Sequence, residues 1–90
     1  MKFTWDSRKA SLNARKHRVT FSEASTAFGD PLSMTIRDPE HAADEERFIL
    51  LGLSNLGRLV VVVHAERGDT IRLISARLAL PSERRAYEEN

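Results

Sequence analysis

The 90-residue chain contains no cysteine, which excludes disulfide bonds and thiolate metal sites. No apolar run approaches the ~18 residues that a membrane-spanning helix needs, and the N-terminal segment lacks the apolar stretch of a signal peptide. A cytoplasmic location is therefore expected. One tryptophan, one tyrosine and four phenylalanines are few aromatic rings for stacking on nucleic-acid bases.

An excess of charge of either sign is also missing. Fourteen Lys and Arg nearly balance 13 Asp and Glu, so that any attraction for nucleic acid depends on where the cations lie. Hydrophobic residues make up 41 % of the chain and charged residues 30 %, an ordinary composition for a globular protein. No linker or repeat divides the sequence, and residues 1–90 are expected to form a single domain.

Hydrophobic periodicity and terminal signals predict an α+β fold with a small antiparallel sheet and helices packed on one face. Asp6 can cap a first helix, and Pro81 can open the last one. Thr20 and Glu23 fit a capping box for the second helix. The polar segment 38–45 is expected to be a loop in which His41 is solvated rather than bound to a metal. The predicted elements are strands at 2–5, 32–37, 46–54, 58–66 and 70–77, and helices ending near 17, near 29 and at 89.

Short connections make the last three predicted strands an antiparallel meander. A two-residue turn at Gly68–Asp69 would pair Arg67 with Thr70 and Val60 with Arg77. A three-residue loop before it would pair Ser54 with Arg58.

These registers sort the strand residues onto two faces. One face is almost entirely aliphatic and is expected to lie under the helices; it holds Ile49, Leu51, Leu53, Leu59, Val61, Val63, Ala65, Ile74 and Ala76, with Arg47 and Arg72 near its end. The other face is mixed and is expected to form a partly covered groove; it holds Phe48, Leu50, Gly52, Val60, Val62 and Leu73 together with Glu46, Ser54, Arg58, His64, Glu66, Ser75 and Arg77.

Most familiar catalytic signatures are absent, including the His-Glu-x-x-His zinc motif and phosphate-binding glycine loops. The arginines, one histidine and two glutamates that remain suit RNA cleavage without a cofactor. Such cleavage needs a base for the 2′-hydroxyl, cations that neutralise the phosphorane and an acid for the leaving 5′-oxygen. Glu46 or Glu66 could be the base, and His64 the acid or the base.

These residues also have ordinary structural explanations. His64 could be a satisfied or rim histidine, and the two glutamates could be cross-strand partners of arginines. The cations of the first helix, within residues 8–16, could form a solvated face. Arg77 is harder to explain in this way, because it continues a strand whose interior normally takes an aliphatic residue.

Four segments occur in order along almost the whole chain: FTWDSRKASLNARKH, FSEASTAFGDPL, EERFILLGLSNLGRLVVVVHAERGDTIRLISAR and ERRAYE. In this combination the chain resembles the BrnT family of ribonuclease toxins from type II toxin–antitoxin systems. The resemblance implies a RelE-like fold and a metal-independent endoribonuclease that inhibits translation and growth. It also implies a hetero-oligomer with a BrnA-like ribbon-helix-helix antitoxin, through which operator DNA would be contacted.

The resemblance implies site residues at the positions that match the family's motifs, which are Lys16, His17, Glu46, Arg47, Arg67, Arg72 and Arg77. Together with the chemical argument, this gives an expected catalytic set of Glu46, His64, Arg67, Arg72 and Arg77, and expected RNA contacts at Lys9, Lys16, His17, Arg47 and Arg58. Two positions depart from the family pattern. Arg18 stands where relatives have a glycine that could adopt a positive φ, and Ala65 stands where many have threonine.

Two other hypotheses remain open from the sequence. In one, the chain is a non-catalytic interaction domain that binds its antitoxin and helps to repress its own operon, as a thin core and a partly apolar groove would suit. In the other, it is an RNA-binding module that uses the cationic arc of the first helix.

Overall fold

The computed structural model describes residues 1–40 and 45–90, so the predicted exposure of His41 lies outside the described residues. In chain order the elements are β1 (Lys2–Thr4), α1 (Ser7–His17), α2 (Phe21–Thr26), the 3-10 helix η1 (Ala27–Gly29), β2 (Met34–Arg37), β3 (Arg47–Leu53), β4 (Leu59–Arg67), β5 (Thr70–Leu78) and α3 (Pro81–Glu89). No helix within these described ranges is long and apolar enough to cross a membrane.

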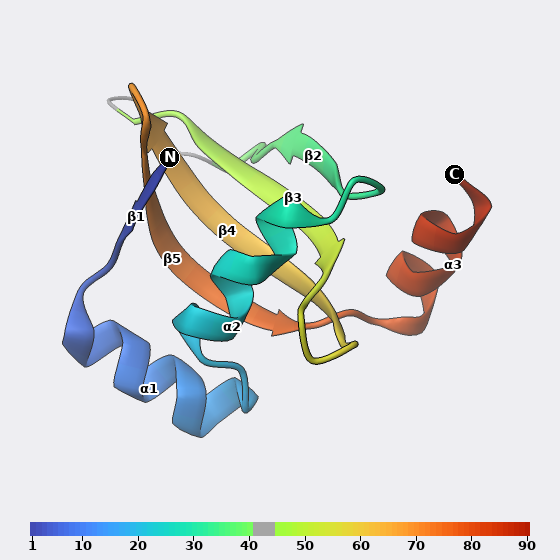
Figure 1. Cartoon of the computed structure of the whole chain (residues 1–90), viewed down its shortest axis with the longest axis horizontal. Coiled ribbons are helices and arrows are strands. Elements are labelled where there is room, and N and C mark those ends of the chain that lie inside the picture. Colours follow the sequence, from blue (N-terminus) through green and yellow to red (C-terminus); the bar gives the residue numbers. More distant parts are fainter. Residues whose placement is uncertain (41–44) are drawn as a thin grey trace.

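The strands form one sheet in the order β1-β5-β4-β3-β2 (Figure 1). β3, β4 and β5 make the predicted antiparallel meander, and β2 adds an antiparallel edge. β1 pairs with β5 in parallel, so the sheet is mixed. The α+β fold with a C-terminal meander followed by a short helix is thereby confirmed.

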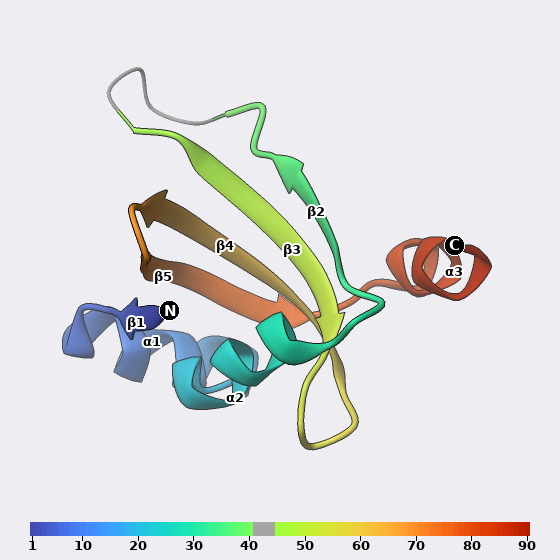
Figure 2. The same cartoon turned by 45° about the horizontal axis from the view of Figure 1, so that its top comes forward.

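Two helices cover one face of the sheet, which we call the inner face; α3 lies apart from them beyond the end of β5 (Figure 2). The inner-face core consists of Val19, Phe21, Ala24, Ala27, Leu50, Val60, Val62, Ile71, Leu73 and Ala76. A smaller cluster of Leu51, Leu59 and Val61 lies on the opposite, outer face, where Ala79 and Tyr87 pack against it.

The prediction of which face the helices cover was wrong. Leu50, Val60 and Val62 belong to the mixed face, and this is the face that lies under α1 and α2. Because β4 is aliphatic on both sides, strand alternation alone cannot choose between them. The packing of Phe21 and Ala24 from α2 against the inner face decides the outcome.

A bulge in β5 also changes the predicted register. The turn pairs Arg67 with Thr70 as expected, but His64 pairs with Leu73 and Val63 with Ser75, which leaves Ile74 without a partner in β4. Beyond this extra residue the side chains of β5 exchange faces. Arg77 therefore lies opposite Val61 rather than Val60, on the outer face.

The free edge of β5 beyond β1 is closed by a side chain of α1. Asn13 donates to the carbonyl oxygen of Ala76 at 2.8 Å and accepts from its amide at 3.1 Å, as a neighbouring strand would. The Asn13 side-chain nitrogen Nδ2 also donates to Val19 O at 3.0 Å. α1 ends at His17, and Arg18 adopts the left-handed conformation with φ 61° that the family's glycine would take easily.

Candidate functional site

A row of four residues crosses the outer face near the β4–β5 turn. Ala65 of β4 pairs with Arg47 of β3 on one side and with Arg72 of β5 on the other, and Arg72 pairs with Thr4 of β1. Two strand spacings separate the arginine Cα atoms by about 10 Å. Because Ala65 between them is small, the row forms a hollow that the Arg72 side chain lines, whereas the Arg47 side chain turns to Asp38 and Glu40.

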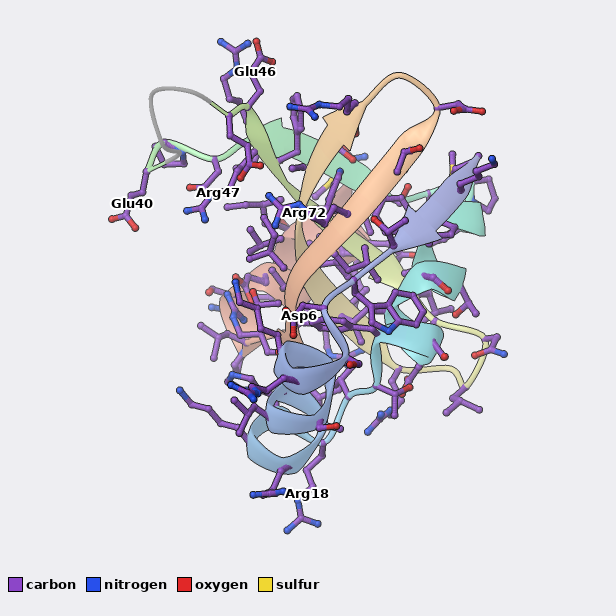
Figure 3. All side chains as sticks on the ribbon, turned by 90° about the vertical axis from the view of Figure 1, so that its left-hand side faces the viewer. Asp6, Arg18, Glu40, Glu46, Arg47 and Arg72 are labelled. Atoms are coloured by element: carbon purple, nitrogen blue, oxygen red, sulfur yellow. The ribbon has the colours of Figure 1, made fainter. Side chains whose placement is uncertain are left out.

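This hollow opens into a pocket of about 550 Å³, which we call the outer pocket. Its lining residues are Thr4, Glu45, Glu46, Ala65, Glu66, Arg67, Thr70 and Arg72. Figure 3 shows Glu46 and Arg47 at the start of β3 and Arg72 nearby on β5, while Arg18 lies at the opposite end of the molecule. The structure thus brings together four predicted site residues, namely Glu46, Arg47, Arg67 and Arg72.

The arginines in or beside the outer pocket differ in their contacts with carboxylates. Arg72 forms an ion pair with Glu45, and Arg47 lies 3.4 Å from a carboxylate oxygen of Asp38. Arg47 Nε is buried without a hydrogen-bond partner in the described part of the chain. Arg67 makes no side-chain hydrogen bond or ion pair with the described residues. Because the Arg72–Glu45 pair is partly exposed and contributes little, a phosphate group could replace the Glu45 carboxylate at small cost, whereas Asp38, the partner of Arg47, is buried.

Glu46 lies at the mouth of the outer pocket, where it forms an ion pair with Arg37 at 2.9 Å. Both side chains are more than half exposed. Glu46 is therefore accessible to a ligand, and its one side-chain contact with a described residue is this solvated ion pair.

His64 is fully buried, at 0 % exposure, and this distinguishes it from a solvent-exposed acid or base. Its ring packs between Phe28, at a centroid distance of 4.8 Å, and Phe48, at 5.8 Å. His64 Nε2 lies 3.0 Å from Glu66 Oε2. Since Glu66 lines the outer pocket, His64 can act on a ligand there only through this carboxylate.

A second pocket, the inner pocket, lies on the other face of the sheet and has a volume of about 270 Å³. Its lining residues are Met1, Phe28, Thr35, Leu50, His64, Glu66, Gly68, Asp69 and Ile71. Glu66 lines both pockets, so they meet at this residue beside the β4–β5 turn.

The predicted RNA contacts of α1 gather in a third, shallow pocket of about 230 Å³. Lys9, Lys16 and His17 line it together with Ile74, the bulged residue of β5. Ile74 follows Arg72 by two residues, so this cationic surface continues along β5 from the outer pocket.

Arg77 does not line the outer pocket and has a carboxylate partner of its own. Its two terminal nitrogens donate to the two oxygens of Glu83 in α3, each at 2.9 Å. The Arg77 guanidinium lowers the pKa of Glu83 against the opposing effect of burial. The side chain predicted as a phosphate contact therefore binds α3 to the sheet.

Arg58 is likewise engaged far from the outer pocket. It forms a bidentate ion pair with the buried Glu23 and donates to Arg18 O at 2.9 Å. Thr20 caps α2 by accepting from the Glu23 amide, as predicted, but the Glu23 side chain turns to Arg58 and Ser54 and does not complete the capping box. The hydrogen bond from Arg58 lowers the pKa of Glu23 although burial opposes it.

Sequence reasoning did not identify Thr4 and Glu45 as site residues. Thr4 reaches the site because β1 pairs in parallel with β5, and no local pattern reveals that pairing. Glu45 stands next to Glu46 in a polar segment, where its contact with Arg72 leaves no signature. Among the described residues, no group of three His, Cys, Asp or Glu side chains could hold a metal ion.

Comparisons with known proteins agree with this geometry. A family model described as "Ribonuclease toxin, BrnT, of type II toxin-antitoxin system" matches residues 5–83. The crystal structure of the Brucella abortus ribonuclease toxin BrnT, at 1.1 Å resolution, superposes with a TM-score of 0.64 at 25 % sequence identity, covering 89 % of this chain and 97 % of that one. No curated protein sequence matches the chain significantly.

Proposed function

We propose, because this chain belongs to the BrnT family of ribonuclease toxins from type II toxin–antitoxin systems, that its outer pocket cleaves RNA internally by 2′-hydroxyl attack. The observation that carries the proposal is the hollow at Ala65, which lies between Arg47 and Arg72. A phosphate placed there would face the guanidinium groups of Arg67 and Arg72, which both line the outer pocket. Two positive groups suit the extra negative charge of a phosphorane.

Glu66 is the residue that we assign as general base. One of its oxygens is held by His64 Nε2 at 3.0 Å, which leaves the other free to take the proton of the 2′-hydroxyl. The 2′-oxygen then attacks phosphorus, and the products are a 2′,3′-cyclic phosphate and a chain with a free 5′-hydroxyl. The leaving 5′-oxygen takes its proton from solvent at the open mouth of the pocket.

Other residues bind or position the RNA in this proposal. His64 is a positioning residue, because its burial keeps it from the reacting phosphate in the outer pocket. Arg67 contacts the scissile phosphate or its neighbour, and Glu46 borders the mouth. Lys9, Lys16 and His17 bind the backbone farther along the strand. Arg58 and Arg77 are left out of the site, because Glu23 and Glu83 occupy their guanidinium groups.

An antitoxin partner follows from membership of a type II toxin–antitoxin family. We propose a BrnA-like ribbon-helix-helix protein that forms a hetero-oligomer with the chain in the cytoplasm and contacts operator DNA itself. An apolar groove on the outer face supports this, since Met34, Ile36, Ile49, Leu51 and Val61 line it. Ile36, on the edge strand β2, is 61 % exposed, which suits a covering partner.

Expression in a bacterium, followed by cleavage of purified RNA, tests the function. The wild-type chain should arrest growth and produce fragments with 2′,3′-cyclic phosphate ends. Glu66→Gln and Arg72→Ala should relieve both effects at equal soluble expression, while Glu89→Gln at the end of α3 serves as a matched control. Soluble wild-type protein that neither arrests growth nor cleaves RNA would favour a non-catalytic partner of the antitoxin instead.

A further inference from the structure

The inner pocket has the shape and chemistry of a site for one nucleobase. Its lining is mainly apolar, with Leu50 and Ile71 among its residues, and the rings of Phe28 and His64 contribute aromatic surface. A volume of about 270 Å³ corresponds to roughly nine water molecules of liquid, which is enough for one base but not for a longer segment. Aromatic and apolar walls favour a base over its charged phosphate.

The two pockets are joined by one side chain. Glu66 lines both, with one face of the sheet bearing the outer pocket and the other bearing the inner one. In the proposed reaction Glu66 takes the proton of the 2′-hydroxyl that precedes the scissile phosphate. The base attached to that same ribose is therefore the one within reach of the inner pocket.

Asp69 supplies a carboxylate at the rim of the inner pocket. It follows Gly68, whose φ of 61° forms the tight β4–β5 turn, and it is exposed. Its backbone oxygen accepts from the Lys2 amide at 2.8 Å, which fixes the turn, and its carboxylate makes no hydrogen bond with the described residues. The rim of the pocket thus presents an acceptor group on a fixed backbone, with no competing donor among the described residues.

We infer that the inner pocket binds guanine on the 5′ side of the cleaved bond, an inference that rests on the proposed function. Guanine presents two adjacent donors, N1–H and the N2 amino group, which match the two oxygens of the Asp69 carboxylate. Uracil presents one donor between two carbonyl oxygens that the carboxylate repels. Adenine and cytosine each offer only an amino donor beside a ring acceptor. Selection therefore combines attraction for guanine with repulsion of the alternatives.

Mapping of cleavage sites in an RNA pool of random sequence tests this inference. Wild-type protein should cut after guanosine about 5- to 150-fold more often than after uridine, as one bidentate contact commonly discriminates. Asp69→Asn should reduce this ratio to about 3-fold or less while RNA is still cut, because Asp69 is outside the proposed reaction. Glu89→Gln should keep the wild-type ratio. Equal cutting after all four bases, or an unchanged ratio in Asp69→Asn, would overturn the inference.

Binding of mononucleotides separates this inference from the proposed function. Guanosine 3′-monophosphate should bind wild-type protein at least about 5-fold more tightly than uridine 3′-monophosphate, with NMR shifts at Phe28 and Asp69. Asp69→Asn should abolish the difference. Preferential guanosine binding without RNA cleavage would support the pocket and refute the ribonuclease proposal, whereas cleavage with equal binding of both nucleotides would refute the pocket alone.

Discussion

Arg77 of β5 and Glu83 of α3 are joined by two parallel hydrogen bonds of 2.9 Å each. Glu83 Oε1 also accepts from the Leu80 amide at 2.8 Å, so one carboxylate binds both the sheet and the start of its own helix. A second contact, from Tyr87 OH to Asp30 Oδ2 at 2.6 Å, holds the other end of α3. The C-terminal helix is thus attached through polar groups at two points, one in β5 and one in the connection between η1 and β2.

Because Glu83 occupies it, Arg77 should matter more for stability than for cleavage. We expect Arg77→Ala to lower the free energy of unfolding by about 1 kcal/mol, a small value because both side chains are partly exposed. RNA cleavage should fall by less than about 3-fold, well below the loss expected for an electrostatic site residue. Urea unfolding and initial cleavage rates measure the two effects. A cleavage loss equal to that of Arg72→Ala, with stability unchanged, would contradict this assignment.

Arg72 and Arg67 should have the opposite profile. Alanine at either position should slow cleavage by about 10- to 1,000-fold and leave the melting temperature nearly unchanged, since each side chain faces the open outer pocket. Arg72→Lys should recover only part of the rate, because an ammonium group cannot form a bidentate contact. Arg85→Ala, on the exposed surface of α3, provides the control. Full activity in both alanine variants would rule out phosphate binding at this site.

The size of Ala65 should be as important as the charges beside it. Ala65→Leu would fill the hollow between Arg47 and Arg72, and we expect cleavage to fall by about 10-fold or more. Val63→Leu, two residues earlier on the same face of β4, adds bulk outside the outer pocket and should leave cleavage within about 2-fold of wild type. Circular dichroism establishes that both variants fold. Equal rates in the two variants would place the reacting phosphate elsewhere.

His64 should act through Glu66. His64→Phe keeps a ring between Phe28 and Phe48 but removes the hydrogen bond to Glu66, so kcat should fall by about 10-fold with KM changed less than about 2-fold. The decisive comparison is the double variant His64→Phe, Glu66→Gln. It should cleave RNA no more slowly than Glu66→Gln alone, because His64 acts only through the Glu66 carboxylate. Fully additive losses would show that His64 contributes independently of Glu66.

Acid should destabilise the protein through Glu23 and Glu83. Both carboxylates have a pKa below the ordinary value of 4.5, chiefly because of hydrogen bonds from Arg58 and Arg77. A carboxyl group whose pKa is lower in the folded protein stabilises it at pH values above the pKa of the unfolded chain. This stability is lost as pH falls through the pKa of the folded protein. The melting temperature should therefore drop below about pH 4.5. Glu23→Gln should be less stable at pH 7, and its stability should change less with pH over this acidic range; an identical pH profile would refute the linkage.

Local signals predicted much of this fold. Asp6 accepts the Lys9 amide at 3.0 Å and Thr20 accepts the Glu23 amide, so both predicted helix caps are confirmed. Alternation and short turns predicted the meander, and the Arg67–Thr70 pair is confirmed. Arg67 and Arg72 lie near the predicted β4–β5 turn and both line the outer pocket, whereas Arg58 and Arg77 lie elsewhere. These features depend on residues close together in the chain, where side-chain type alone fixes the backbone.

Features that depend on distant contacts could not be predicted in this way. Nothing near Asn13 indicates that its side chain will close the edge of β5, and nothing near Glu23 shows that Arg58 will draw it away from a capping box. The burial of His64 follows from Phe28 and Phe48, which arrive from separate elements. Predicting each of these contacts requires knowing which face of the sheet the helices cover. Because both sides of β4 are aliphatic, the sequence did not decide this.

The bulge at Ile74 determines what kind of sequence change the protein can accept. Arg72 and Arg77 are five positions apart and would lie on opposite faces of a regular strand, yet the unpaired Ile74 brings both to the outer face. Loss of this bulge with the five-residue spacing retained would turn the Arg77 guanidinium into the core and expose Ala76, whereas deletion of Ile74 would make the strand regular with both arginines still on the outer face. We therefore expect the bulge and the five-residue spacing to be kept or lost together during divergence, while the type of residue at position 74 remains free to vary.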